Sequence, residues 1–221
     1  MAFIVAIDGP AGSGKGTITK LVGKRMNLIN IDTGAMYRCV ALECLNKNIK
    51  YDDLNGIKKV LDNINIEFKK ENDKELTFLN GIDVTEEIRT TMVNENVAKY
   101  AAVKLIRDKM TPLQRKMGEK NNIIMEGRDI GTVVFPNADV KIFLDCSVEE
   151  RARRRYNQNL EKGIDCTYDE VLERIKERHK LETEIEVAPF VRADDAIYVD
   201  TTKLTIEEVT EKIINIIENK K

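Results

Sequence analysis

The segment Gly9–Thr17, GPAGSGKGT, constrains the fold of this chain more than any other stretch of the sequence. It directly follows the apolar run Phe3–Ile7 and precedes a helix-like segment that starts near Lys15. A strand that feeds Gly-x-x-x-x-Gly-Lys into a helix is typical of a phosphate-binding loop, because small residues let backbone N–H groups approach an anion and the helix N-terminus favours negative charge. We expect Lys15 to reach the terminal phosphates, and the loop to comprise Gly9, Pro10, Ala11, Gly12, Ser13, Gly14, Lys15, Gly16 and Thr17.

Gly16 departs from the usual form of this loop. The motif normally places Ser or Thr directly after the lysine as a magnesium ligand, whereas here Thr17 comes one position later. We therefore expect a magnesium ion at this loop to keep more of its water. A glycine-rich turn that merely contains a lysine is the alternative, and the strand-loop-helix context disfavours it.

The composition fits an enzyme and excludes several other classes. With 221 residues, of which 42% are hydrophobic, the chain can bury a sizeable core. A net charge of −2 gives no global basic field, so we expect no nucleic-acid partner. No apolar run approaches the roughly 20 residues of a membrane span, and the N-terminus lacks a signal-peptide pattern, which predicts a cytoplasmic protein without a membrane partner. Without CxxC or zinc spacing, the cysteines are expected to be reduced, packed thiols: Cys39, Cys44, Cys146 and Cys166.

Short apolar runs alternate with helix-period segments, which predicts an α/β fold with a mainly parallel sheet flanked by helices. The alternating residues from 62 to 88, with the hairpin signal Asn80-Gly81, predict a small antiparallel insert. Capping-box patterns predict three helix starts, at Ser147…Glu150, Thr167…Glu170 and Thr205…Glu208. The five core strands are expected at about 3–8, 27–31, 122–126, 140–145 and 196–200.

Polar side chains follow two of these strands. Ligands of open α/β sheets bind outside the carboxyl ends of the strands, so the segment Asp32–Arg38 is expected to face a substrate, with Arg38 on an acceptor phosphate. Glu126 is placed to organise a hydrated magnesium ion, Arg128 to bind phosphate and Asp129 to accept hydrogen bonds from a base or ribose. The alternatives are a helix-capping turn at residues 32–34 and an internal pair of Arg128 with Glu126 or Asp129.

A cluster of arginines follows the fourth core strand, at Arg151, Arg153, Arg154 and Arg155. Like charges three and four apart oppose helix formation by a few tenths of a kcal/mol per pair, so the cluster needs anionic partners. Glu149 and Glu150 supply some of them. A triphosphate or an adenine ring beside the phosphate loop is the functional interpretation, and a solvated basic face is the structural one.

Together these segments resemble the bacterial cytidylate kinase family over essentially the whole chain. The strongest matches are IDGPAGSGKGT at 7–17, DTGAMYR at 32–38, EGRDIGTVVFP at 126–136, KIFLDCSVEERARRR at 141–155 and VAPFVRADDAIYVDTT at 187–202. The resemblance implies a P-loop NTPase core of five parallel strands, an antiparallel insert that binds the nucleoside monophosphate, and a helical lid. Within one domain, 1–221, it implies a core at 1–37, 101–155 and 190–221, the insert at about 38–100 and the lid at about 155–190.

The resemblance also implies an activity, the transfer of the γ-phosphoryl group of ATP to CMP or dCMP with Mg²⁺, in a monomer. The residues implied for ATP are Gly9 to Thr17, Arg151 and Arg155. Those implied for CMP are Thr33, Tyr37, Arg38, Arg107, Arg128, Asp129, Arg178 and Glu182. Catalysis would involve Lys15, Arg128, Arg155 and Arg178, with Glu126 near the metal through water. The alternatives are a kinase for another small acceptor, such as UMP or AMP, and a P-loop switch protein, which lacks support because no Asn-Lys-x-Asp segment is present.

The lid departs from the family pattern of an Arg, an Asp four residues later and an Arg three residues after that. Arg178 matches, but Glu182 and Ile185 occupy the other two positions. Glu182 can still accept from ribose hydroxyls, whereas Ile185 has no donor for a base. His179 stands where the family often has an acidic residue, and we expect it to be a solvated surface side chain.

Overall fold

The computed structural model describes residues 2–72, 74–161, 163–184, 187 and 189–220. The chain forms two compact units, one of residues 1–32 and 115–221 and the other of residues 33–114. The domain boundaries implied by the family resemblance, at 37/38, 100/101, 155 and 190, stay predictions.

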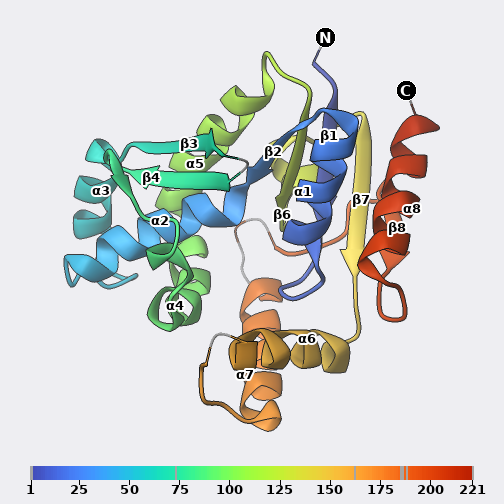
Figure 1. Cartoon of the computed structure of the whole chain (residues 1–221). Helices are drawn as coiled ribbons and strands as arrows, with labels where there is room; N and C mark the ends of the chain where they lie inside the picture. Colours follow the sequence, from blue (N-terminus) through green and yellow to red (C-terminus); the bar gives the residue numbers. More distant parts are fainter. Residues whose placement is uncertain (1, 73, 162, 185–186, 188, 221) are drawn as a thin grey trace. The chain divides into compact units, whose positions relative to one another are not determined.

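The first unit is built on a five-stranded sheet whose neighbouring strands all run parallel, as the sequence predicts (Figure 1). The strand order is β2-β6-β1-β7-β8. Because Asp8 lies opposite Gly127 in the register, β1 and β6 end at the same edge of the sheet. The bounds are Ile4–Asp8 for β1, Ile29–Asp32 for β2, Ile123–Gly127 for β6, Val140–Asp145 for β7 and Ile197–Asp200 for β8.

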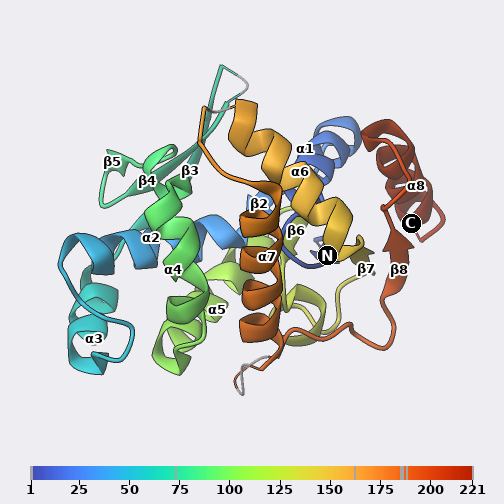
Figure 2. The ribbon, with the colours of Figure 1, turned by 90° about the horizontal axis from the view of Figure 1, so that it is seen from below.

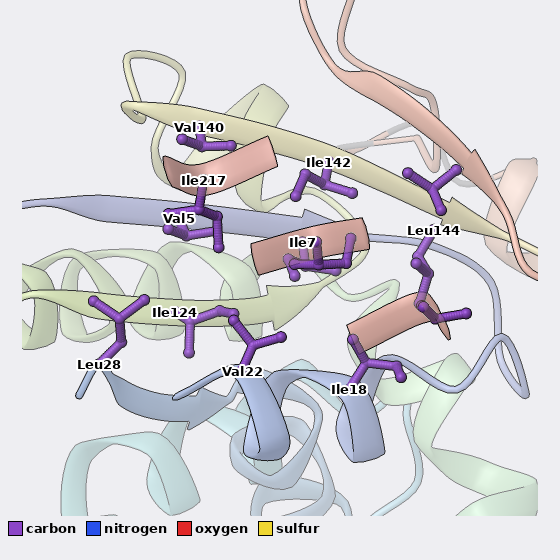
Figure 3. Packing of buried hydrophobic residues seen from close by; sticks show 13 residues of the cluster. Val5, Ile7, Ile18, Val22, Leu28, Ile124, Val140, Ile142, Leu144 and Ile217 are labelled. Carbon is purple, nitrogen blue, oxygen red and sulfur yellow. The ribbon is translucent and has the colours of Figure 1, made fainter. Parts of the chain in front are cut away.

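Both faces of this sheet are apolar, because alternate residues of each strand point to opposite sides. On one face, Val5 and Ile7 of β1 pack with Ile18 and Val22 of α1 (Lys15–Met26), and α8 (Ile206–Glu218) completes the cluster (Figure 3). On the other face, Ala6, Ile123 and Met125 pack with the short helical segment η2 (Ile130–Val134). The sheet is therefore a rigid platform for the loops at its carboxyl edge.

Two helices follow β7 and pack against each other, α6 (Val148–Glu161) and α7 (Tyr168–Thr183) (Figure 2). Ala152 of α6 contacts the α7 residues Val171 and Ile175 in a small apolar cluster. Tyr156 and Tyr168 add an edge-to-face contact with ring centroids 6.3 Å apart. These two helices occupy the segment for which the sequence implies a helical lid.

Two of the three predicted capping boxes are present and one is incomplete. In both Thr167…Glu170 and Thr205…Glu208, the threonine accepts from the glutamate N–H and the glutamate accepts from the threonine N–H. At Ser147 only the first half is as predicted, since its Oγ accepts from Glu150 N–H. The Glu150 carboxylate instead accepts from Arg153 and Arg154, because a guanidinium forms stronger hydrogen bonds than a backbone amide.

The second unit contains the predicted antiparallel insert. Its three strands have the order β3-β4-β5, and Asn80 and Gly81 join β4 to β5 with φ of 51° and 84°, as the hairpin signal predicts. The bounds are Ile66–Glu71 for β3, Lys74–Leu79 for β4 and Ile82–Asp83 for β5. The helices of the unit are α2 (Thr33–Asn46), α3 (Leu54–Asn63), η1 (Glu87–Arg89) and α4 (Thr91–Ala101), and α5 (Lys104–Gly118) spans the boundary between the units.

The cysteines are packed thiols, as predicted. Cys39, Cys44 and Cys146 are buried and Cys166 is half-buried. Burial raises the pKa of Cys44 to about 11, so this thiol stays protonated at neutral pH.

Candidate functional site

The loop between β1 and α1 has the geometry of the predicted phosphate-binding loop. It turns through Gly12 and Gly14, whose φ values of 82° and 91° favour glycine, and α1 begins directly afterwards at Lys15. The Ser13 hydroxyl is buried and has no hydrogen-bond partner in the described part of the chain. The loop thus presents the N-terminus of a twelve-residue helix and an unused hydroxyl, both suited to phosphate.

Lys15 is buried beneath this loop. Its Nζ donates to the Pro10 carbonyl oxygen at 2.9 Å. Burial, together with the nearby Arg128 guanidinium, lowers the pKa of Lys15 to about 7, while Glu126 acts in the opposite direction. A phosphate placed against the loop would supply the negative charge that keeps this ammonium protonated.

The carboxylate of Glu126 lies next to Gly16, the residue that follows Lys15. A Cβ atom at Gly16 would lie 2.9 Å from Glu126 Oε1, so a larger residue here would require this carboxylate to shift. Glu126 is buried at the carboxyl end of β6. Among the described residues, no group of three or more His, Cys, Asp or Glu side chains could hold a metal ion. A magnesium ion here would therefore rely on Glu126, phosphate oxygens and water, which is the ligand set that this ion usually takes.

Arg128, Arg178 and Glu182 form an ion triad. Arg128 Nε donates to Glu182 Oε2 at 3.0 Å, and Arg178 Nε donates to Oε1 of the same carboxylate at 2.8 Å. Glu182 is only 7% exposed. Burial by itself would raise the pKa of Glu182, but the two guanidinium groups outweigh it and hold the pKa well below its usual range. The structure therefore brings Arg128 together with two residues of α7, Arg178 and Glu182, and the Arg128–Glu182 bond spans 54 positions of the sequence.

Asp8 is a site residue that the sequence interpretation missed. Its carboxylate is buried at the end of β1 and accepts the N–H groups of Ile130 and Gly131, each at 2.8 Å. Burial raises the pKa of Asp8 to about 6, although both hydrogen bonds lower it. The neighbouring Asp129, predicted to contact the base, is buried as well. The available signal was a carboxylate at the carboxyl end of an apolar strand, immediately before the phosphate loop.

The four arginines on α6 lie in different surroundings. Arg151 is buried, and its Nη1 donates to the Ala11 carbonyl of the phosphate loop at 3.4 Å. Arg154, which was not predicted among the ATP ligands, donates to the Ser13 carbonyl at 3.4 Å. Arg153 is exposed and pairs with Glu150, one of the internal partners that we expected. Arg155 is half-buried, and its role toward ATP stays a prediction.

The second unit holds the remaining predicted residues. Thr33 is buried at the start of α2, and the Arg107 guanidinium lies 5.6 Å from the ring centroid of buried Tyr37. Arg38 Nε donates to Asn94 Oδ1 at a long 3.4 Å. Their expected roles toward CMP stay predictions.

Of two expectations about the lid, one is wrong and the other concerns a residue outside the described part of the chain. The prediction that His179 is a solvated surface side chain is wrong: it is half-buried, its ring meets that of Phe190 edge-to-face at 6.1 Å, and its Nδ1 is buried without a partner among the described residues. His179 lies on the face of α7 that contacts Phe190, a residue of the segment that follows the lid helices. The sequence alone could not show where this segment lies. Ile185, which replaces the second arginine of the family pattern, lies outside the described residues.

Comparison with known proteins gives a consistent match along the chain. A family model for cytidylate kinase matches residues 5–219. A cytidylate kinase of Fusobacterium nucleatum is 54% identical over 219 residues, which cover 99% of each chain, and one of Bacillus subtilis is 45% identical over 98% of this chain and 96% of that protein. A solved structure of an uncharacterized protein from Eubacterium ventriosum has a TM-score of 0.53 at 14% identity over 98% of both chains, which indicates a shared fold only. In the described part of the chain, no helix is long and apolar enough to cross a membrane.

Proposed function

This chain belongs to the cytidylate kinase family, and on that premise we propose that it transfers the γ-phosphoryl group of ATP to CMP or dCMP, giving ADP and CDP or dCDP. The observation that carries the proposal is the juxtaposition, in one unit, of the phosphate loop with its buried Lys15 and the Glu126–Asp129 segment at the end of the adjacent strand. The first set of residues suits a polyphosphate, and the second set suits a metal and an acceptor.

In this proposal the loop from Gly9 to Thr17 binds the phosphates of ATP, and Lys15 neutralises charge on the phosphoryl group in transfer. Arg151 and Arg154 hold the loop by their bonds to its carbonyl groups, and Arg155 lies on the same helix for a contact with ATP. The helix N-terminus is in place before ATP arrives, and the phosphates of ATP would favour the protonated form of Lys15.

Glu126 is the residue that would hold Mg²⁺, through water, and its carboxylate lies directly beside Gly16 of the loop. When bound, this ion would neutralise the phosphate oxygens that carry charge during transfer. The fit rests on a buried carboxylate that faces the loop and on the ion's preference for few protein ligands.

No general base is required for the acceptor. The second ionisation of a phosphate monoester lies near a pKa of ~6, so the attacking oxygen of CMP is already deprotonated at neutral pH. Arg128 and Arg178 have the charge and the fork geometry to bind this phosphate, and Asp129 has acceptors for the cytosine amino group. The proposal assigns Thr33, Tyr37, Arg38 and Arg107 to CMP as well, and Glu182 to the ribose hydroxyls. Closure of the α6–α7 lid would limit hydrolysis of ATP by excluding water.

A coupled assay of ADP release with CMP, dCMP, UMP and AMP tests this function. We expect rapid turnover with CMP and dCMP and slow turnover with UMP and AMP. Preference for UMP or AMP would make the chain a kinase for a different acceptor, and ATP consumption that no acceptor stimulates would indicate a nucleotide switch. A location in the cytoplasm and a monomeric state belong to the same proposal, and gel filtration checks the second of these.

A further inference from the structure

Asp8 is a buried ionisable residue to which the proposed reaction gives no chemical task. It belongs to β1, the central strand, whereas both N–H groups that it binds belong to the segment after β6. The hydrogen bonds join residues 122 and 123 positions apart in the sequence. Burying a carboxylate is costly unless its oxygens are satisfied, so these two bonds fix the position of Ile130 and Gly131 relative to β1.

The segment that Asp8 holds is the one that carries the acceptor-side residues. Arg128 and Asp129 immediately precede Ile130, and Gly9 of the phosphate loop immediately follows Asp8. Gly131 permits the close approach, because a Cβ atom there would lie 3.3 Å from Asp8 Oδ2 and 3.2 Å from Lys141 Cδ. Asp8 thus joins the loop that suits the phosphates of ATP to the segment that suits CMP.

We infer that Asp8 is a positioning residue for the acceptor: it holds the Arg128–Asp129 segment in register with the phosphate loop, so that the acceptor phosphate is aligned for in-line attack. The inference rests on the proposed function only for the identity of the acceptor. A displacement of about 1 Å at such a segment can lower the rate roughly 100-fold. A carboxylate that fixes the segment therefore favours the reaction even though its burial is unfavourable.

The variant Asp8→Asn tests the inference with little change in volume. An asparagine keeps one acceptor oxygen, but its NH₂ group would face the second backbone donor. We expect the KM for CMP to rise at least roughly tenfold, because a buried donor is left without a partner, while the KM for ATP changes by less than about threefold. Hydrogen exchange at the Ile130 and Gly131 amides should become faster.

Asp200→Asn is the control, at an exposed position of the same sheet. Asp200 also ends a strand of the same sheet and accepts two hydrogen bonds, from the N–H and the hydroxyl of Thr202, but its loop carries none of the proposed CMP ligands. We expect both KM values of this variant to stay within about twofold of the wild type, since surface substitutions away from a site have small effects.

Gly131→Ala is the second test variant and decides the matter if Asp8→Asn does not fold. It retains the Asp8 carboxylate, but its Cβ atom would require a shift of a few tenths of an ångström between residue 131 and its neighbours Asp8 and Lys141. A smaller rise in the KM for CMP, with the KM for ATP unchanged, is expected. The inference is overturned if Asp8→Asn leaves the KM for CMP unchanged, if both KM values rise equally as the melting temperature falls, or if the two amides stay protected.

The wild-type acceptor assay separates this inference from the proposed function. If the wild type prefers another nucleotide, the proposed function has failed, and the same KM comparison is made with the preferred acceptor. A selective acceptor effect would then still support the positioning role, and its absence would overturn it.

Discussion

Asp8 and Glu182 are two buried carboxylates of the same unit that are satisfied in opposite ways. Asp8 accepts from two neutral backbone N–H groups, whereas Glu182 accepts from two guanidinium groups. Burial disfavours both charges, yet the pKa of Asp8 is raised to about 6 and that of Glu182 is held well below its usual range. The charge of the hydrogen-bond donors, rather than the depth of burial, decides whether the pKa of the carboxylate is raised or lowered.

This difference separates a fixed region of the site from an exchangeable one. At the loop, Asp8 and Lys15 form hydrogen bonds to backbone groups of Ile130, Gly131 and Pro10. None of these backbone groups is one that we assign to the binding of CMP. At the lid, Glu182 bonds to Arg128 and Arg178, which are proposed to bind the acceptor phosphate. An acceptor phosphate would therefore compete with Glu182 for these cations, and the following predictions test the two regions separately.

The largest effect is expected at the loop. Lys15→Ala should lower kcat by roughly 10³-fold with little change in thermal unfolding, because the transferred phosphoryl group loses the positive charge that stabilises it in the transition state. The coupled ADP assay measures the rate, and Lys20→Ala, an exposed lysine on the same helix, is the control. Activity within about tenfold of the wild type would contradict the catalytic role of Lys15 and of the loop that contains it.

The next effect concerns the lid. Glu182→Gln should lower the free energy of unfolding by about 3 kcal/mol at pH 7, because two partly buried guanidinium groups lose their counter-charge. Urea unfolding measures it, and the exposed Glu184→Gln should change it by less than about 0.5 kcal/mol.

The same variant gives a pH dependence. The folded-state pKa of Glu182 lies below the value of 4.5 expected without the triad, so its contribution is present above that pH and is lost as the pH falls below it. Wild type and Glu182→Gln should therefore converge in acid. A constant difference from pH 7 to pH 3 would contradict the ion triad.

At Asp8 the sign is reversed. Because its folded-state pKa of about 6 exceeds the usual 3.8, the folded protein binds a proton between these values that the unfolded chain does not. The wild type should gain about 2 kcal/mol over Asp8→Asn as the pH falls from 6 to 4. Urea unfolding of the wild type and Asp8→Asn between pH 6 and pH 4 measures this gain. If the difference in the free energy of unfolding stays constant over this range, the pKa of Asp8 is not raised and the contrast with Glu182 fails.

A smaller effect is expected at Asp129. Asp129→Asn should raise the KM for CMP by roughly tenfold and narrow the CMP-over-UMP ratio, because an amide both donates and accepts and so discriminates less between the two bases. Kinetics with both acceptors test this, with Asp62→Asn, at an exposed position of α3 whose partner Lys58 is also exposed, as the control. An unchanged ratio would mean that the base is recognised elsewhere.

Sequence reasoning succeeds here where the signal is local. The strand-loop-helix geometry at Gly9–Thr17, the five strands, the Asn80-Gly81 hairpin and the capping box at Thr167 all depend on residues a few positions apart, and the structure confirms them. Ser147 shows the limit, because Arg153 and Arg154 compete for Glu150 with stronger, charged hydrogen bonds.

The missed contacts are long-range ones. Asp8 meets Gly131 across 123 residues and Glu182 meets Arg128 across 54, and neither pairing has a sequence pattern. Glu182 was identified from the family pattern as a ribose ligand, but its two arginine partners required the fold. The half-buried position of His179 likewise depends on Phe190, which returns from beyond the lid.

The fate of the γ-phosphate tests the central claim most directly. With ATP labelled in its γ-phosphate and CMP as acceptor, a rapid-quench experiment measures how much label enters CDP and how much appears as inorganic phosphate. The account predicts one labelled CDP for each ADP formed, with almost no inorganic phosphate. Label released mainly as inorganic phosphate, or label that stays in ATP, would contradict phosphoryl transfer to a nucleoside monophosphate.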